Sequence, residues 1–190
     1  AASDDAGVEL LLHRLSPAGQ DRARVLAVFH GGVSLVVLHK MMGWGLPELD
    51  ELARELIATG LATPNPHKHV SLEPTLRPYL RAHMQRAECE ALEARWVAAM
   101  RGYVELLAQL RSQHPEVAAK LTLLDLPNLF ALLAHVQETG DAETAISLTT
   151  ALHGLLQDMG KPRLLECVAQ VRDSAVRLFQ HDGRHTSPGD

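Results

Sequence analysis

The sequence predicts a mainly α-helical protein in two parts: helices around one β-hairpin, then an antiparallel array of helices. Hydrophobic residues make up 46% of the 190 residues and charged residues 22%, which is typical of a folded chain with a packed core. Aromatic residues are only 4%, so the core must be aliphatic, as in helix-on-helix packing. Apolar residues recur at helical spacing over most of the chain, and only the segment 61–72 reads as paired strands.

Residues 1–15 are expected to form a lead-in followed by a short apolar helix, VELLLHRL, over 8–15. Ser16 and Pro17 then predict a second helix over 17–29, with serine as its N-cap and proline at its first position. Gly31 and Gly32 end that helix. The chain starts without Met on the linker-like sequence AASDDAG, so we expect it to be a piece of a longer protein or a processed product.

The segment 35–80 is the centre of the first part. LVVLHKMM at 35–42 is apolar nearly all round, with Ser34 as its predicted cap and Gly43 as its end. Pro47 begins the next helix, which has acidic residues in its first turn, and Gly60 ends it. Two short strands, 61–63 and 69–72, can then pair across the turn-forming residues 64–66.

Another helix follows from Glu73 and Pro74, although Pro78 leaves its start open by one turn. Helix, helix, hairpin and helix in this order are the pattern of a winged helix. We place that domain, with its short β-hairpin, at 16–86.

The second part, 87–180, is predicted to be an antiparallel helical-repeat array, followed by a flexible polar tail at 181–190. Four shorter helices at 115–124, 127–138, 142–158 and 162–180 are separated by tight turns, which make neighbours antiparallel. A long helix over 88–112 precedes them. Its apolar residues step by four and three, which predicts a one-sided seam: Leu92, Trp96, Ala99, Tyr103, Leu106 and Leu110.

Three stretches resemble the segment behind the nucleotide-binding module of STAND ATPases, the NB-ARC-type signal-transduction ATPases. RLSPAGQDRARVLAVFHGGVSLVVLHKMMG and LPELDELARELIATGLAT with HVSLEPTLRPYL are similar to the winged helix of that family. DLPNLFALLAHVQETGDAETAISLTTALHGLLQDMGKP is similar to the first tetratricopeptide (TPR)-like helices that follow it in bacterial members. The resemblance covers 8–178 and implies a fragment that lacks the ATPase module, so ATP or ADP would belong to an upstream module.

The family's nucleotide-sensing Met-His-Asp motif would fall on Leu72-Glu73-Pro74, which has neither the histidine nor the aspartate. No residue is therefore carried over as a nucleotide ligand, and we expect no cofactor within this chain. The stretch from Gly154 to Lys161 has one residue too many between its glycines for a phosphate loop, and a helix turn is the expected structure.

The histidines are the other candidates for chemistry. His67 and His69 alternate on the hairpin, so both can face one side and bind a metal if a third ligand arrives. The turn itself supplies no third ligand, and exposed wing residues are the competing interpretation. His30 and His39 lie in segments predicted as apolar helices and are expected to be partly buried and hydrogen-bonded.

Three functions remain open. The first is a non-catalytic regulatory module whose winged helix relays a nucleotide state to a helical arm that binds a protein partner. The second is a DNA-binding transcriptional regulator, which the charge disfavours: the net charge is -5, and the presumed recognition helix carries four acids, Glu48, Asp50, Glu51 and Glu55, against Arg54. The third is an enzyme with a scattered, unrecognised site. We expect no catalytic residue.

The two cysteines, Cys89 and Cys167, lie far apart and outside any CxxC motif, which favours reduced thiols in the cytoplasm. No apolar run approaches the length of a membrane span, so no membrane association is predicted. The sequence leaves the partner, the stimulus and the oligomeric state open.

Overall fold

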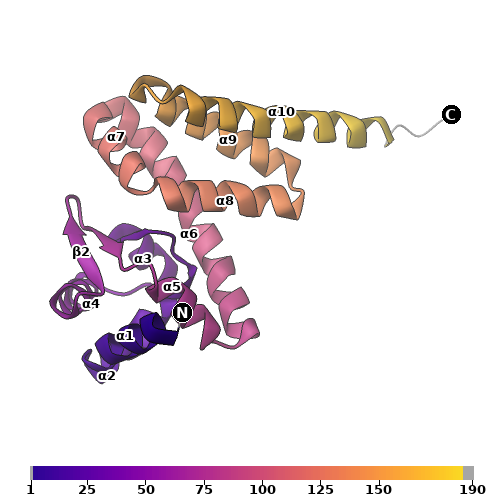
Figure 1. Ribbon diagram of the computed structural model, residues 1–190. Coiled ribbons are helices and arrows are strands. Elements are labelled where there is room, and N and C mark those ends of the chain that lie inside the picture. The colour runs from indigo at the N-terminus through magenta and orange to yellow at the C-terminus, as the bar shows by residue number, and fades with distance from the viewer. Residues whose placement is uncertain (1, 186–190) are drawn as a thin grey trace. The chain divides into compact units, whose positions relative to one another are not determined.

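The computed structural model describes residues 2–185, and the side chains of residues 6–181, as a mainly helical chain with one small sheet (Figure 1). Its contacts divide the chain into two compact units, Ala1–Met100 and Arg101–Asp190. The predicted mainly α fold class is confirmed at this level. The expected two-stranded hairpin is part of a three-stranded antiparallel sheet, because a strand that was not predicted adds to it.

The first unit begins with three short helical elements: α1 (Ala2–His13), α2 (Pro17–Ala23) and the 3-10 helix η1 (Arg24–Val28). Helix α1 starts earlier than predicted, since a helix formed over its apolar residues extends into the preceding ones. The single helix expected over 17–29 was wrong in its second half. Four consecutive residues, Val25 to Val28, are all buried, so this segment is enclosed by the core and contacts α5 rather than presenting one face.

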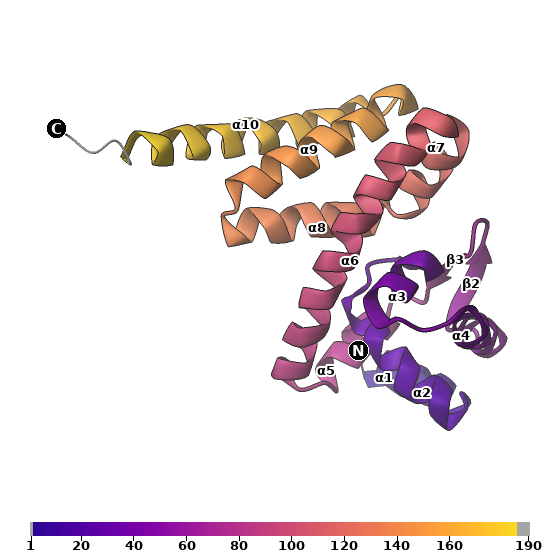
Figure 2. The ribbon, with the colours of Figure 1, turned by 180° about the vertical axis from the view of Figure 1, so that it is seen from behind.

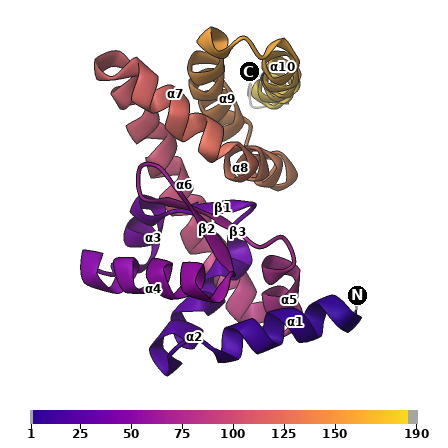
Figure 3. The ribbon, with the colours of Figure 1, turned by 60° about the vertical axis from the view of Figure 1, so that its left-hand side comes forward.

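The sheet and its helices follow as β1 (Gly32–Ser34), α3 (Leu35–Met42), α4 (Leu46–Thr59), β2 (Ala62–Asn65), β3 (His69–Leu72) and α5 (Leu76–Ala82). The strand order is β1-β3-β2, and β3 pairs antiparallel with both neighbours. Figure 3 shows the three strands together with α4 beside them. Gly43 and Gly60 end α3 and α4 with φ of 72° and 82°, so both predicted helix ends are confirmed.

The predicted cap Ser34 lies at the N-cap position of α3, but its side chain makes no capping hydrogen bond there. It belongs to β1, whose backbone pairs Val33 with Val70. A side chain at Gly32 could not be accommodated, because its Cβ would lie 2.9 Å from the Val70 carbonyl oxygen and 2.5 Å from the His69 ring. The close approach of β1 to β3 therefore depends on this glycine.

The hairpin turn lies one to two residues later than predicted. Pro64 and Asn65 belong to β2, and the turn residues His67 and Lys68 adopt φ of 60° and 55°. Pro64 is tolerated in β2 because β2 is an edge strand of the sheet. On the open side of an edge strand no ladder hydrogen bond is lost when proline lacks an N–H. Helix α5 begins at Leu76, before Pro78, so this proline does not delay the helix.

The long helix α6 (Arg86–Gln113) continues from the first unit into the second. The first four residues of the predicted seam, from Leu92 to Tyr103, are buried. The seam then moves: Leu106 is 37% exposed and Leu107 is fully buried. A strict four-three alternation repeats every 3.5 residues, whereas a straight helix repeats every 3.6, so the buried stripe drifts along a long helix.

The second unit contains the end of α6, then α7 (Pro115–Leu124), α8 (Leu126–Thr139), α9 (Ala142–Leu156), the 3-10 helix η2 (Gln157–Met159) and α10 (Pro162–His185). Helices α9 and α10 lie side by side and run in opposite directions (Figure 2). Helix α10 continues into the segment predicted as a tail, and residues 186–190 lie outside the described part. The predicted domain boundary at residue 87 lies at the start of α6, whereas the compact units divide at Met100.

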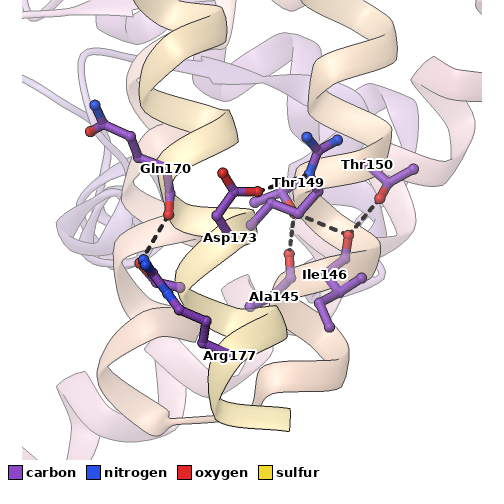
Figure 4. Close-up of polar contacts among 9 residues, drawn as sticks. Ala145, Ile146, Thr149, Thr150, Gln170, Asp173 and Arg177 are labelled. Carbon is purple, nitrogen blue, oxygen red and sulfur yellow. Dashed lines mark hydrogen bonds and ion pairs between the residues drawn. The ribbon is translucent and has the colours of Figure 1, made fainter. Parts of the chain in front are cut away.

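The core of this unit is aliphatic, as the composition predicts, and consists mainly of Leu129, Leu132, Leu133, Val136, Leu148, Leu152, Leu155, Leu156 and Val168. Two threonines of α9, the buried Thr149 and the exposed Thr150, are hydrogen-bonded within their own helix. The Thr149 hydroxyl donates to the Ala145 carbonyl at 2.7 Å, and that of Thr150 donates to Ile146 at 2.8 Å (Figure 4). Side chains bonded in this way leave the α9 surface that faces its neighbours apolar.

Candidate functional site

The exposed surface of α4 is acidic, and part of its charge is paired within the first unit. Glu51 forms an ion pair with Arg22 at 2.9 Å, and Asp50 lies 3.7 Å from the Lys68 ammonium of the hairpin turn. Lys68 is therefore partly neutralised by α4. With Arg22, Arg54 and Lys68 beside Glu48, Asp50 and Glu51, this surface has no positive excess to attract the phosphate backbone of a nucleic acid.

Glu55 is not part of that outer acidic surface, which corrects the four-to-one count made from the sequence. Its carboxylate accepts hydrogen bonds from the Ser16 backbone N–H at 2.7 Å and from the Ser16 hydroxyl at 2.8 Å. The same hydroxyl accepts from the Gly19 N–H at 3.0 Å, so Ser16 is the N-cap predicted for α2. Glu55 thus fastens α2 to α4.

The structure does not place His67 and His69 on one side of the hairpin. His67 is exposed in the turn, whereas His69 is 2% exposed at the start of β3. The side chain of Asn65 lies 3.0 Å from His69 Nδ1 and 2.6 Å from the Ser71 hydroxyl. The two-residue alternation of a strand does not extend into a turn with positive φ, so the two rings are not on one face. Among the described residues, no group of three or more His, Cys, Asp or Glu is placed to hold a metal ion.

The predictions for His39 and His30 are each confirmed in part. His39 is exposed rather than partly buried, but it is hydrogen-bonded: its Nδ1 lies 2.7 Å from the Trp44 carbonyl oxygen. His30 is half-buried as expected, with its ring 5.8 Å from the Trp96 ring. It lies after η1 rather than within a helix. No pattern in the sequence predicted that the charges of Arg77 and Arg81 would act on it.

A cavity of about 250 Å³ lies between α1, α2 and α5 in the first unit. One wall is formed by the stacked rings of Tyr79 and His83, whose centroids are 4.2 Å apart. The charged groups at its rim are Glu9, His13, Asp21 and Arg24. Since the Arg24 guanidinium is already paired with Glu88 at 2.7 Å, the carboxylates of Glu9 and Asp21 leave the rim with a negative excess. Such a cavity disfavours a strongly anionic ligand.

A smaller groove of about 90 Å³ lies in the second unit, on α8, α9 and α10. Its apolar lining consists of Val136, Ala142, Ala145, Val171, Ala175 and Leu178. Leu178 is 57% exposed, and the next residue, Phe179, is 56% exposed. Leu178 lines the groove and Phe179 follows it on α10, and large apolar side chains exposed at or next to a groove are typical of a surface that another protein covers.

The stretch compared with a phosphate loop lies within helical structure, with Gly154 in α9 and Gly160 at the end of η2 with φ of 63°. Arg111 pairs with Asp158 across this end of the second unit at 3.0 Å.

Cys89 is buried and Cys167 is exposed, and both are free thiols.

Comparison of the chain with family models, with curated proteins and with solved structures found no match. In the described part of the chain, no single helix is both long and apolar enough to cross a bilayer. Helices α7 and α8 meet the length and composition criteria only as a pair, and they are bent by 71° at their junction.

Proposed function

We propose that the chain is a non-catalytic regulatory and protein-interaction segment of a STAND-type ATPase. In this proposal a winged helix at 16–86 relays the nucleotide state of an upstream module, and a TPR-like array at 87–180 binds a protein partner. ATP or ADP belongs to the upstream module, because the segment that would sense it here has Leu72-Glu73-Pro74 in place of Met-His-Asp.

The order of elements supports the winged-helix part of the proposal. A strand precedes two helices, a hairpin follows them, and the strand order is β1-β3-β2, so the first strand closes the sheet next to the last. The TPR-like part is supported by α8, α9 and α10, which follow one another through short turns that each contain a glycine of positive φ. Helical pairs stacked in this way present long surfaces for partners.

The observation that carries the partner-binding role is the exposed Leu178 in the apolar groove of α8, α9 and α10, with Phe179 exposed next to it along α10. An amphipathic helix of a partner would bury these side chains and the groove beside them. The outer face of α4 has no positive excess, which argues for protein rather than DNA as the ligand of the first unit, since a groove-reading helix needs positive charge toward phosphate.

The test uses the whole gene product. Hydrogen exchange is measured with ADP and with a non-hydrolysable ATP analogue, and peptides from both 16–86 and 101–185 are compared. We expect exchange in both regions to differ between the nucleotides. The absence of a nucleotide-binding module before Ala1, or identical exchange in both states, would overturn the relay.

Partner binding is tested by cross-linking in cells followed by purification. We expect Leu178→Asp to abolish a cross-link that the control Leu10→Asp retains, because Leu10 is equally exposed, at 66%, but lies on α1 in the first unit. A cross-link unaffected by Leu178→Asp contradicts the role of the groove. A salt-sensitive shift of labelled duplex DNA by the 190-residue chain would instead favour the DNA-binding alternative.

A further inference from the structure

Two arginines on α5, Arg77 and Arg81, form a cationic cluster within the first unit. They are four residues apart, so they lie on the same face of the helix, and both side chains are half-buried. Like charges at this spacing repel each other. The cluster therefore places two guanidinium groups where their mutual repulsion is incompletely screened by solvent.

Among the described residues, Glu93 on α6 is the carboxylate that forms an ion pair with this cluster. Its Oε2 lies 4.0 Å from Arg81 Nη2, beyond the 2.7–2.9 Å of a charged hydrogen bond. Two guanidinium charges against one distant carboxylate leave the cluster with a net positive charge.

The cluster also contains donors that lack acceptors. Arg77 Nε and Arg81 Nη1 are both excluded from solvent and have no hydrogen-bond partner among the described residues. The same holds for Trp96 Nε1, in the indole that packs against His30. Charged donors buried without acceptors are unfavourable, and an anion with several oxygen atoms relieves this cost at more than one of them.

His30 completes the cluster as a neutral group. Burial, followed by the charges of Arg77 and Arg81, lowers its pKa to about 4, while the charge of Glu93 opposes them. Burial and Arg81 also lower the pKa of Arg77. At neutral pH the imidazole therefore adds no charge to the cluster.

We propose that Arg77 and Arg81, beside His30, form a binding site for a phosphate-type oxyanion. A tetrahedral oxyanion supplies acceptors to two separate guanidinium groups at once, which a single carboxylate does less completely. Its negative charge balances the excess that Glu93 leaves. The anion is either free phosphate or the phosphate group of a larger molecule. This site is independent of the proposed partner-binding groove, which lies in the other unit.

The experiment titrates the 190-residue chain with inorganic phosphate against chloride at constant ionic strength and measures the thermal midpoint. A ligand that binds only the folded state raises the midpoint with a saturable dependence. We expect saturation for the wild-type chain and at least about tenfold weaker binding for Arg77→Gln, because a charged bidentate donor is lost. The control Arg95→Gln removes an exposed arginine of α6 in the same unit and should bind phosphate as the wild type does.

A second measurement does not depend on folding of the variant. In the wild-type chain, the ¹⁵N resonance of the Arg77 Nε–H should shift during the phosphate titration, and the Arg95 Nε–H should not. Three results would each overturn the site. The thermal midpoint could respond equally to phosphate and chloride, Arg77→Gln could bind phosphate as tightly as the wild-type chain, or the Arg77 Nε–H resonance could stay unchanged during the titration. O-phosphoserine separates the sources: similar affinity assigns the site to the free anion, and about tenfold tighter binding assigns it to a phosphate ester.

Discussion

Replacing Gly19 by alanine should destabilise the first unit, although alanine is the better helix former. Gly19 is buried in α2, where a Cβ would lie 2.5 Å from Glu55 Oε2 and 3.1 Å from the Ser16 hydroxyl. The Glu55 side chain is flexible enough to move away. Moving it breaks the two hydrogen bonds that its carboxylate accepts from Ser16, at 2.7 Å and 2.8 Å.

The two effects have opposite signs, and their sizes decide the outcome. Alanine gains up to about 1 kcal/mol over glycine inside a helix. Hydrogen bonds to a charged group contribute about 1.5–3 kcal/mol each when shielded. Since the Ser16–Glu55 contacts are exposed, we reduce this to about 1 kcal/mol each. Partial loss of the N-cap adds about 0.5 kcal/mol. The net loss is therefore about 1–2 kcal/mol for Gly19→Ala.

The assay is urea unfolding followed by far-UV circular dichroism, with Gly19→Ala and Glu55→Ala measured alone and together. Once Glu55 is alanine, the clash disappears and only the helix propensity remains. Gly19→Ala should then become neutral or stabilise by about 0.5–1 kcal/mol, a reversal of sign that gives a coupling energy above about 1 kcal/mol. If Gly19→Ala stabilises the wild-type chain, or if the two effects simply add, the fastening of α2 by Glu55 is wrong.

Three further outcomes test other parts of the first unit. Trp96→Ala should cost about 3 kcal/mol in urea unfolding, because the indole is 2% exposed, and a loss below about 1 kcal/mol would contradict its role in the core. Glu51→Ala should change stability by no more than about 0.5 kcal/mol by the same assay, since its pair with Arg22 is on the surface. The pKa of His30 is about 4 in the folded chain and about 6.5 unfolded, so stability should fall as pH drops from about 6.5 to about 4. After discounting for solvent screening, we expect about 1–2 kcal/mol of loss there, and a His30→Gln variant measured over the same pH range should lack it.

The helix boundaries were the part of the fold most open to prediction. Gly43 and Gly60 end their helices in the left-handed conformation, and Pro17 and Pro47 lie in the first turn of α2 and α4. These positions are governed by local backbone sterics, which the residue type alone specifies. The strand β1 was missed because its three residues are too few to show a period and its pairing with β3 is not local.

The candidate sites were far less predictable. His67 and His69 share a sequence pattern that fits a metal site, yet one lies in a turn and the other is buried. Arg77 and Arg81 lie in a segment where the sequence drew attention only to its apolar residues and prolines. They are a candidate anion site because Arg77 Nε and Arg81 Nη1 have no acceptor among the described residues. That depends on how α5 packs and cannot be predicted from the residue types.

The sequence by itself determined the mainly α fold class, the aliphatic core, most of the helices and the acidic balance of α4, because composition, helical spacing and turn residues act locally. Only the tertiary structure decided which charges are paired and which are buried. Glu55 bonds Ser16 across 39 positions, and Arg81 lies 4.0 Å from Glu93 on another helix. Electrostatic energy depends on distance and burial in space, and neither can be read from the order of residues along the chain.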